Sequence, residues 1–89
     1  MILHTALGHH PFEMKRRLYL LVQSGHIRLG GNKRLKIYGT LQCTSGKRLS
    51  INNRVFFATA TEAQSAGYRP CGHCMRAAYM LWKDTMKKQ

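Results

Sequence analysis

Apolar residues near the start of the chain recur at the spacing of an amphipathic helix. Proline suits the first turn of a helix, and Pro11 precedes apolar residues that recur three and four positions apart. These are Met14, Leu18, Leu21 and Val22. Gly25 can adopt the left-handed conformation that ends many helices. The pattern therefore predicts a helix over residues 11–24 with one apolar face.

The next segment alternates between apolar and polar residues, which is typical of β-strands. The run Gly-Gly-Asn at residues 30–32 separates two such stretches, so residues 26–43 are predicted to form a hairpin that turns there. One side of the second strand is apolar: Leu35, Ile37, Gly39, Leu41 and Cys43. The other side is polar and partly basic: Arg34, Lys36, Tyr38, Thr40 and Gln42. An extended strand would direct Cys43 toward the interior.

The second half of the chain predicts a strand, a short capped helix and a final helix. Residues 54–58 are mostly apolar and follow two asparagines, which favours a strand after a turn. Thr59 and Glu62 have the spacing of a capping box, and Gly67 is placed to end the helix that follows. Residues 73–86 carry their apolar side chains on one stripe, which predicts a second amphipathic helix.

The predicted elements occur in the order helix, hairpin, strand, short helix, helix, without an internal repeat or a linker. A few strands accompanied by separate helices are typical of the α+β class. We therefore expect residues 1–89 to form a single α+β domain, in which flanking helices cover a small antiparallel β-sheet.

The chain carries a large excess of positive charge, with 15 lysine and arginine residues against 3 acidic ones and a formal net charge of +12. Such an imbalance favours a polyanionic partner, either nucleic acid or an anionic membrane. The basic residues are spread along the chain, whereas a membrane anchor would collect them on one amphipathic helix. Nucleic acid is therefore the expected partner and no membrane contact is expected, although a merely soluble basic surface is the alternative.

The chain contains 3 cysteines, an odd number that cannot all pair in disulfides. Because the sequence shows no leader or membrane span, we expect a cytoplasmic protein with reduced thiols. Two residues separate Cys71 from Cys74, a spacing at which both thiolates can bind one metal ion. Cys43 is the remaining thiol, and a domain of 89 residues gains stability from such a metal. The predicted cofactor is Zn²⁺, which takes four ligands.

The fourth zinc ligand is expected to be a histidine. His4 is preferred because it lies in an apolar N-terminal segment, although an ordinary core histidine would fit that segment too. His26 follows a helix-ending glycine, and His73 lies between the two cysteines, where its side chain should point away. Both are alternatives, as is water, although a water-bound zinc is typical of catalytic sites and no carboxylate lies near these motifs.

Several runs of residues between positions 35 and 75 together carry a family resemblance. They are Ile37-Tyr38, Asn53-Arg54-Val55-Phe56-Phe57, Thr61-Glu62-Ala63, Ala66-Gly67-Tyr68-Arg69-Pro70-Cys71 and Cys74. This segment resembles the N-terminal metal-binding domain of the Ada-type DNA methylphosphotriester repair proteins. The most specific part is the Arg-Pro-Cys-x-x-Cys end, which arrives after the capped helix.

The resemblance implies four zinc-bound cysteines, the first of which accepts a methyl group from a DNA phosphotriester. In the family that first cysteine directly follows the Ile-Tyr pair, and here the position is Gly39. Cys43, Cys71 and Cys74 correspond to the other three ligands. Because glycine has no thiol, the resemblance implies a zinc-binding scaffold without its methyl acceptor, and no catalytic residue is assigned.

The expected function is that of a structural zinc-binding module that binds nucleic acid, with DNA expected from the resemblance. Basic residues that flank the site or line the polar face of the sheet are expected to contact phosphates: Lys33, Arg34, Lys36, Lys47, Arg48, Arg54, Arg69 and Arg76. One alternative is an enzyme, either a methyl acceptor that uses a remaining zinc-bound cysteine or a hydrolase with an open zinc position. Another is a regulatory module that binds a protein partner or senses oxidation.

Overall fold

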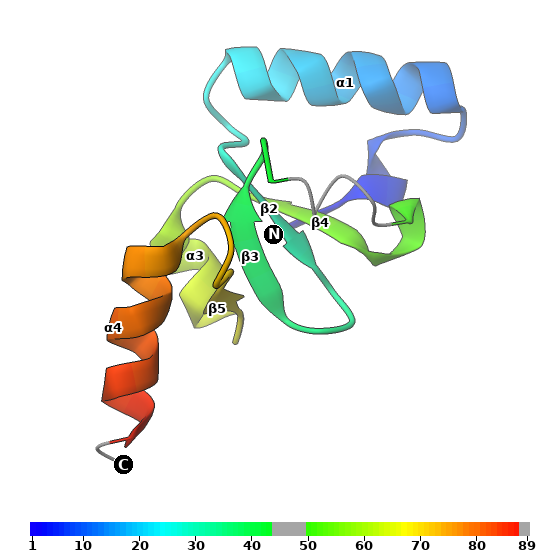
Figure 1. Cartoon of the computed structure of the whole chain (residues 1–89). Helices are drawn as coiled ribbons and strands as arrows, with labels where there is room; N and C mark the ends of the chain where they lie inside the picture. The colour runs from blue at the N-terminus through cyan, green and yellow to red at the C-terminus, as the bar shows by residue number, and fades with distance from the viewer. Residues whose placement is uncertain (44–49, 88–89) are drawn as a thin grey trace.

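The computed structural model describes residues 1–43 and 50–87 of the chain (Figure 1). Its strands are β1 (Ile2–Leu3), β2 (Leu29–Asn32), β3 (Ile37–Thr40), β4 (Arg54–Phe57) and β5 (Arg69–Pro70). Its α-helices are α1 (Pro11–Gln23), α3 (Ala60–Ser65) and α4 (Arg76–Lys87), and two 3₁₀ helices are η1 (His4–Leu7) and η2 (Ile51–Asn53). No helix in the described part of the chain is long and apolar enough to cross a bilayer.

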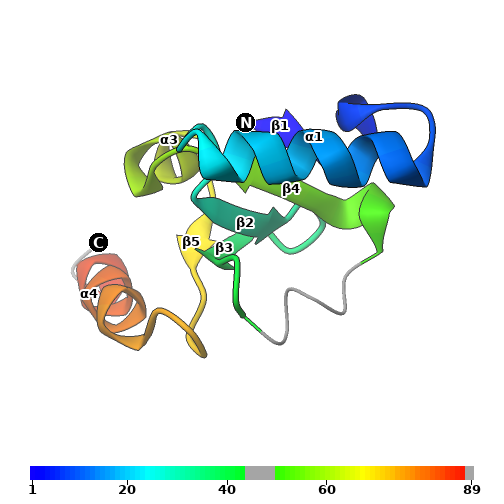
Figure 2. The same cartoon turned by 90° about the horizontal axis from the view of Figure 1, so that it is seen from above.

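The strands form one sheet in the order β1-β4-β2-β3-β5. Neighbouring strands pair antiparallel except β3 and β5, which run parallel. The predicted α+β class is therefore confirmed. Strands β1 and β5 lie at opposite edges, and Figures 1 and 2 show α4 continuing away from the sheet near β5, far from α1.

The hydrophobic core has two parts, one on each face of the sheet. Strand β4 contributes to both, because its successive residues point to opposite faces. Val55 and Phe57 pack with Ala63 of α3 on one face, whereas Phe56 packs with Met14 of α1 on the other. The short sheet is thus covered by α1 on one face and by α3 on the other.

The helix signals in the sequence correspond closely to the structure. Helix α1 begins at Pro11, and Gly25 just beyond its end has a φ of 81°. At the start of α3 the backbone N–H of Glu62 donates to the hydroxyl oxygen of Thr59 over 3.1 Å. Gly67 follows with a φ of 87°. These predictions are confirmed because a cap and a stop glycine fix each helix locally.

The predicted hairpin turn is wrong. Residues 30–32 belong to β2, and the chain turns at residues 33–36 instead. The side-chain oxygen of Asn32 accepts hydrogen bonds from the backbone N–H groups of Arg34 and Leu35, and Lys36 closes the turn with a φ of 57°. The glycine at position 31 serves packing: a Cβ there would lie 3.0 Å from the ring of Phe57.

The predicted polar face of the second strand is only partly right, because Arg34, Lys36 and Gln42 are exposed but Tyr38 is buried. Tyr38 is 1% exposed and belongs to the core on the α3 side. Its hydroxyl accepts a hydrogen bond from the Gln64 side chain over 3.0 Å. The sequence pattern misled because a buried tyrosine satisfies its polar end through one such bond.

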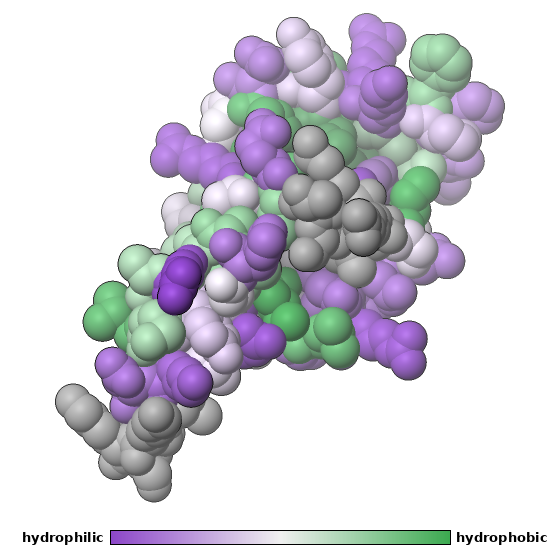
Figure 3. All heavy atoms as spheres, in the orientation of Figure 1, coloured by the Kyte–Doolittle hydropathy of each residue, from purple (hydrophilic) through white to green (hydrophobic). Residues whose placement is uncertain are grey.

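Helix α4 is covered on only one side. Tyr79 and Trp82 are half-buried, whereas Met80 and Leu81 are 49% and 70% exposed. Figure 3 shows apolar side chains on the surface of this end of the molecule. The predicted apolar stripe therefore rests against the sheet edge rather than inside a closed core.

Candidate metal centre

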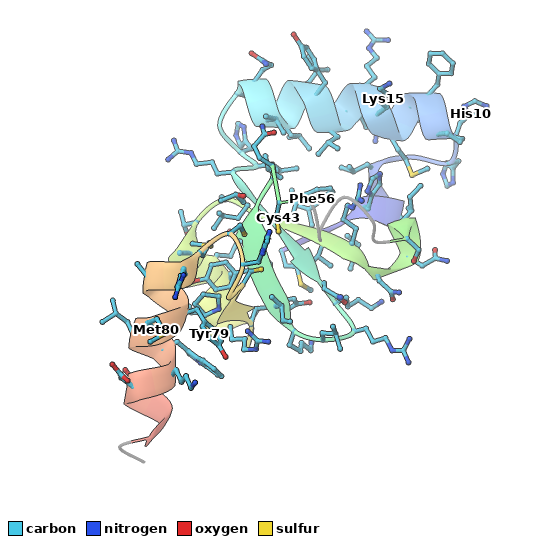
Figure 4. The ribbon with its side chains drawn as sticks, viewed as in Figure 1. His10, Lys15, Cys43, Phe56, Tyr79 and Met80 are labelled. Carbon is cyan, nitrogen blue, oxygen red and sulfur yellow. The ribbon has the colours of Figure 1, made fainter. Side chains whose placement is uncertain are left out.

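The parallel pairing of β3 and β5 brings the three cysteines together. In a parallel pair, both strands end at the same side of the sheet. Cys43 follows β3 in a turn, in which its backbone N–H donates to the carbonyl of Thr40 over 3.2 Å. Cys71 directly follows β5 and continues the ladder, because its N–H donates to the carbonyl of Tyr38 over 2.8 Å. The chain then turns through Cys74, so that Cys43 meets the pair from a distant part of the sequence. Figure 4 shows Cys43 at the end of β3.

The spacing of the three sulfurs fits a zinc ion. All three Sγ atoms lie within 4.8 Å of one another, and those of Cys43 and Cys71 are 4.0 Å apart. Zinc–sulfur bonds of about 2.3 Å in a tetrahedron place the sulfurs about 3.8 Å apart. The cysteines are reduced in this structure, and Cys43 is buried. The donor set of three convergent thiols therefore suits Zn²⁺ with little rearrangement.

Backbone N–H groups point at two of the sulfurs, as they do where a thiolate must be stabilised. The N–H of Thr40 donates to the Sγ of Cys74, and the N–H of His73 donates to the Sγ of Cys71, each over 3.4 Å. Burial raises the pKa of the Cys74 thiol, and the hydrogen bond from Thr40 opposes that rise. A bound zinc ion holds such thiols in the deprotonated form.

Gly39 lies directly against this cluster. An added Cβ at this position would lie 2.6 Å from the Sγ of Cys74 and 3.2 Å from the Cβ of Cys71. No side chain can be built there without displacing Cys74. Position 39 thus borders the metal centre, although it contributes no donor atom of its own.

His4 does not join the three sulfurs. It follows β1, at the opposite edge of the sheet from β5, and the group of convergent donor atoms contains only the cysteines. The imidazole is 7% exposed, with its ring centre 5.4 Å from that of Phe56. Its Nδ1 atom has no hydrogen-bond partner among the described residues. Burial lowers the pKa of His4, and the positive charge of Arg54 lowers it further.

The two alternative histidines also lie outside the cluster. His26 is exposed, and its Nδ1 is 2.6 Å from the hydroxyl oxygen of Ser24. His73 is exposed within the turn between the cysteines and contributes its backbone N–H rather than its ring. Among the residues that the structure describes, only Cys43, Cys71 and Cys74 offer converging ligand atoms.

The predicted phosphate-binding residues occupy three different settings. Lys33, Arg34 and Lys36 lie exposed on the turn between β2 and β3, and Arg76 is exposed at the start of α4. Arg54 is half-buried at the start of β4. Lys47 and Arg48 lie outside the described residues.

Arg69 has a structural contact that the sequence analysis did not predict. Its guanidinium lies over the rings of Tyr79 and Trp82, 5.2 Å and 5.6 Å from their centres, and donates to the carbonyl of Pro70 over 3.0 Å. Such cation–π contacts attach α4 to β5 beside the cysteines. The signal was present in the sequence, since two aromatic residues three positions apart on a helix share one face.

The fold and the three-cysteine cluster together define a small α+β metal-binding domain. The family described as the metal binding domain of Ada matches residues 27–76, and the chain belongs to this family. It is an Ada-type zinc-binding domain with a metal site of three cysteines. The resemblance found in the sequence is confirmed.

One curated relative is named Endonuclease YhcR, from Bacillus subtilis (strain 168). It is 39% identical to this chain over 59 residues, which make up 66% of this chain and 4% of that protein. The chain therefore spans only a small part of the relative. No solved structure matches the chain.

Proposed function

We propose that this domain is a zinc-stabilised module that binds nucleic acid, with DNA as its expected ligand. The observation that carries the proposal is a formal net charge of +12 on a domain of 89 residues built around a metal centre. Positive charge of this size favours contact with a phosphate backbone. The name of the relative, an endonuclease, is consistent with a nucleic-acid ligand.

The zinc has a structural role in this proposal. Cys43 fixes the end of β3, and Cys71 fixes the end of β5 next to the start of α4. A domain of this size buries only a small core, so a metal that joins three segments adds a large share of its stability. Bound zinc would supply deprotonated thiolates and a rigid connection among those segments.

Methyl transfer is not part of the proposed function. The resemblance places the family's methyl-accepting cysteine at Gly39, and that residue lies beside the cluster without a thiol. Cys43 is the most buried of the three remaining thiols, so it is poorly placed to meet a phosphotriester. The domain is therefore proposed to retain the zinc scaffold and the nucleic-acid contact of the family.

The turn between β2 and β3 is the proposed centre of phosphate contact. Lys33 and Arg34 are both exposed there, and no acidic residue lies on that turn. Lys36 is also on the turn, but its amine lies 5.0 Å from the centre of the Tyr68 ring. Lys33 and Arg34 are thus the better positions for a test, because both side chains are exposed and neither has a ring contact like that of Lys36.

The proposal is tested by measuring duplex DNA binding over a range of salt concentrations by fluorescence anisotropy. Each lost phosphate contact should reduce the slope of log K against log salt by about 0.9, so Lys33→Gln with Arg34→Gln should reduce it by about 1.8. The matched control is Lys15→Gln with Arg16→Gln, which removes the same charge from exposed positions of α1.

The control should leave the slope close to that of the unchanged protein. Equal losses in both double variants would contradict the placement of the interface on the turn. Affinity that does not depend on salt would contradict nucleic-acid binding altogether, and tighter binding to duplex RNA of the same sequence would contradict the preference for DNA.

A further inference from the structure

We infer that the metal centre has an exchangeable fourth coordination position, and that a neutral planar nitrogen heterocycle reaches it through a slot beside the cysteines. The proposal depends on the zinc site and is independent of nucleic-acid binding. The structural role of zinc needs only the three cysteines, so the slot beside them is available to a ligand of this class.

The described part of the chain brings three donor atoms to the metal centre. Zinc in proteins takes four ligands, and three sulfurs converge here. The ranges 44–49 and 88–89 contain no histidine, cysteine, aspartate or glutamate. Every such side chain therefore lies in the described residues, and only those of the three cysteines come together. The fourth position is thus left open to a donor from outside this set.

The cysteine cluster can be reached from a pocket at its side. A pocket of about 480 Å³ borders it, and both Cys43 and Cys71 line this pocket. Gly30 and Gly39 also line it and face each other across β2 and β3. The pocket thus extends over the sheet directly from the sulfurs.

Of these two glycines, Gly30 leaves bare backbone on the floor of the slot, whereas Gly39 is covered by the Cys74 sulfur. A Cβ on Gly39 would point at Cys74, whereas a Cβ on Gly30 would meet nothing closer than the Leu41 side chain at 3.7 Å. Among the described residues, one further atom therefore fits above Gly30 at ordinary van der Waals distances. Apolar side chains stand around the floor: Leu18 and Val22 of α1, Leu41, and Phe56 of β4. A flat, largely apolar molecule fits such a site.

The charge and the thiolate ligands of the metal centre determine which kind of fourth donor it favours. A divalent zinc with three thiolates has a net charge of −1, and an anionic fourth ligand would raise this charge further. Centres rich in thiolate favour nitrogen or sulfur donors over the oxygen donors that suit hard cations. An uncharged heterocyclic nitrogen meets both conditions, and its ring can lie beside the backbone of Gly30.

Two arginines line the slot, but their charges are directed elsewhere. Arg69 is engaged by the rings of Tyr79 and Trp82 and by the Pro70 carbonyl. Arg54 begins β4, which pairs with β1 so that Leu3 lies opposite Val55, and this register places Arg54 near His4. The guanidinium groups therefore do not convert the end of the slot beside the cysteines into an anion site.

The test uses the cobalt-loaded protein, because the visible spectrum of Co²⁺ reports its ligands directly. Imidazole is the probe and should produce a saturable change in the d–d bands. Gly30→Ala places a methyl group on the slot floor without touching a cysteine, and it should weaken imidazole binding about tenfold or more. Ser65→Ala, which changes an exposed residue of α3, is the matched control and should leave the titration unchanged.

Gly39→Cys provides an independent test. A fourth thiolate should occupy the position proposed for imidazole, so imidazole should no longer change the cobalt spectrum. If that variant fails to fold, the Gly30→Ala comparison still decides. A spectrum that does not respond to imidazole would overturn the proposal, as would equal affinity for acetate or phosphate. An unchanged imidazole titration in Gly30→Ala would overturn the assigned slot. Because no DNA is present, these results stand apart from the outcome of the DNA-binding assay.

Discussion

Replacing His4 with leucine distinguishes two roles for this residue: a buried core histidine, as its packing indicates, and a zinc ligand, as the sequence analysis predicts. In the structure this imidazole is a buried core group whose Nδ1 atom has no hydrogen-bond partner among the described residues, and it lies apart from the three converging sulfurs. An unsatisfied buried polar atom costs about 1–3 kcal/mol, and a ring pair such as His4 with Phe56 contributes about 0.5–1.5 kcal/mol. His4→Leu should therefore leave the domain as stable as before or stabilise it by about 1 kcal/mol.

The same substitution should remove part of the pH dependence of stability. Because burial depresses the pKa of His4, the unfolded chain binds a proton on this imidazole more readily than the folded domain does below about pH 6.5. The stability of the unchanged protein should therefore fall as the pH drops below that value. At pH 5.5 the loss attributable to this imidazole is at most about 1.4 kcal/mol.

The assay is urea unfolding of the zinc-loaded proteins at pH 7.5 and pH 5.5, combined with zinc affinity from competition with a chelator. The difference between the unchanged protein and His4→Leu isolates the imidazole from the titration of the thiols. His26→Leu, at an exposed position, is the control. A fall in zinc affinity of about a hundredfold in His4→Leu alone would refute this reasoning and restore His4 as a ligand.

Three further predictions follow from the packing around the site. Complete removal of zinc by a chelator should lower the melting temperature by about 10 °C or more and reduce the far-UV circular dichroism signal; an unchanged melting curve would contradict the structural role of zinc. Arg69→Met should release α4 from β5 and lower the stability of the domain by about 1–2 kcal/mol. A red shift in the fluorescence of the single tryptophan, Trp82, would report this release, whereas an unshifted spectrum would show that the cation–π contacts are dispensable. Gly31→Ala should destabilise the domain by about 1–3 kcal/mol, since the new methyl group would lie 3.0 Å from Phe57, whereas Gly30→Ala should cost much less; equal costs would contradict the assigned faces of β2.

Local signals in the sequence were reliable where one turn of backbone decides the structure. The Thr59 cap, the stops at Gly25 and Gly67, and the start of α1 at Pro11 all depend on residues within a few positions. The convergence of the cysteines was also predictable, because the Cys71–Cys74 spacing and the family resemblance specify it together.

Features that depend on tertiary contacts could not be predicted from the pattern alone. The glycine pair that looked like a turn lies in β2, because Gly31 packs against Phe57, and this contact joins strands distant in sequence. His4 lies in an apolar segment that suits a buried ligand, yet β1 lies at the edge of the sheet opposite β5 and the cysteines. Strand order is set by long-range pairing, and no periodicity along the chain encodes it.

The coordination of zinc itself provides the most direct test of the account. X-ray absorption at the zinc edge of the purified, zinc-loaded protein should show three sulfurs at about 2.3 Å and one lighter donor. Metal analysis of the same sample should give one zinc ion for each chain. A shell with fewer than three sulfurs, or a protein that retains no zinc after purification in its presence, would contradict the central claim.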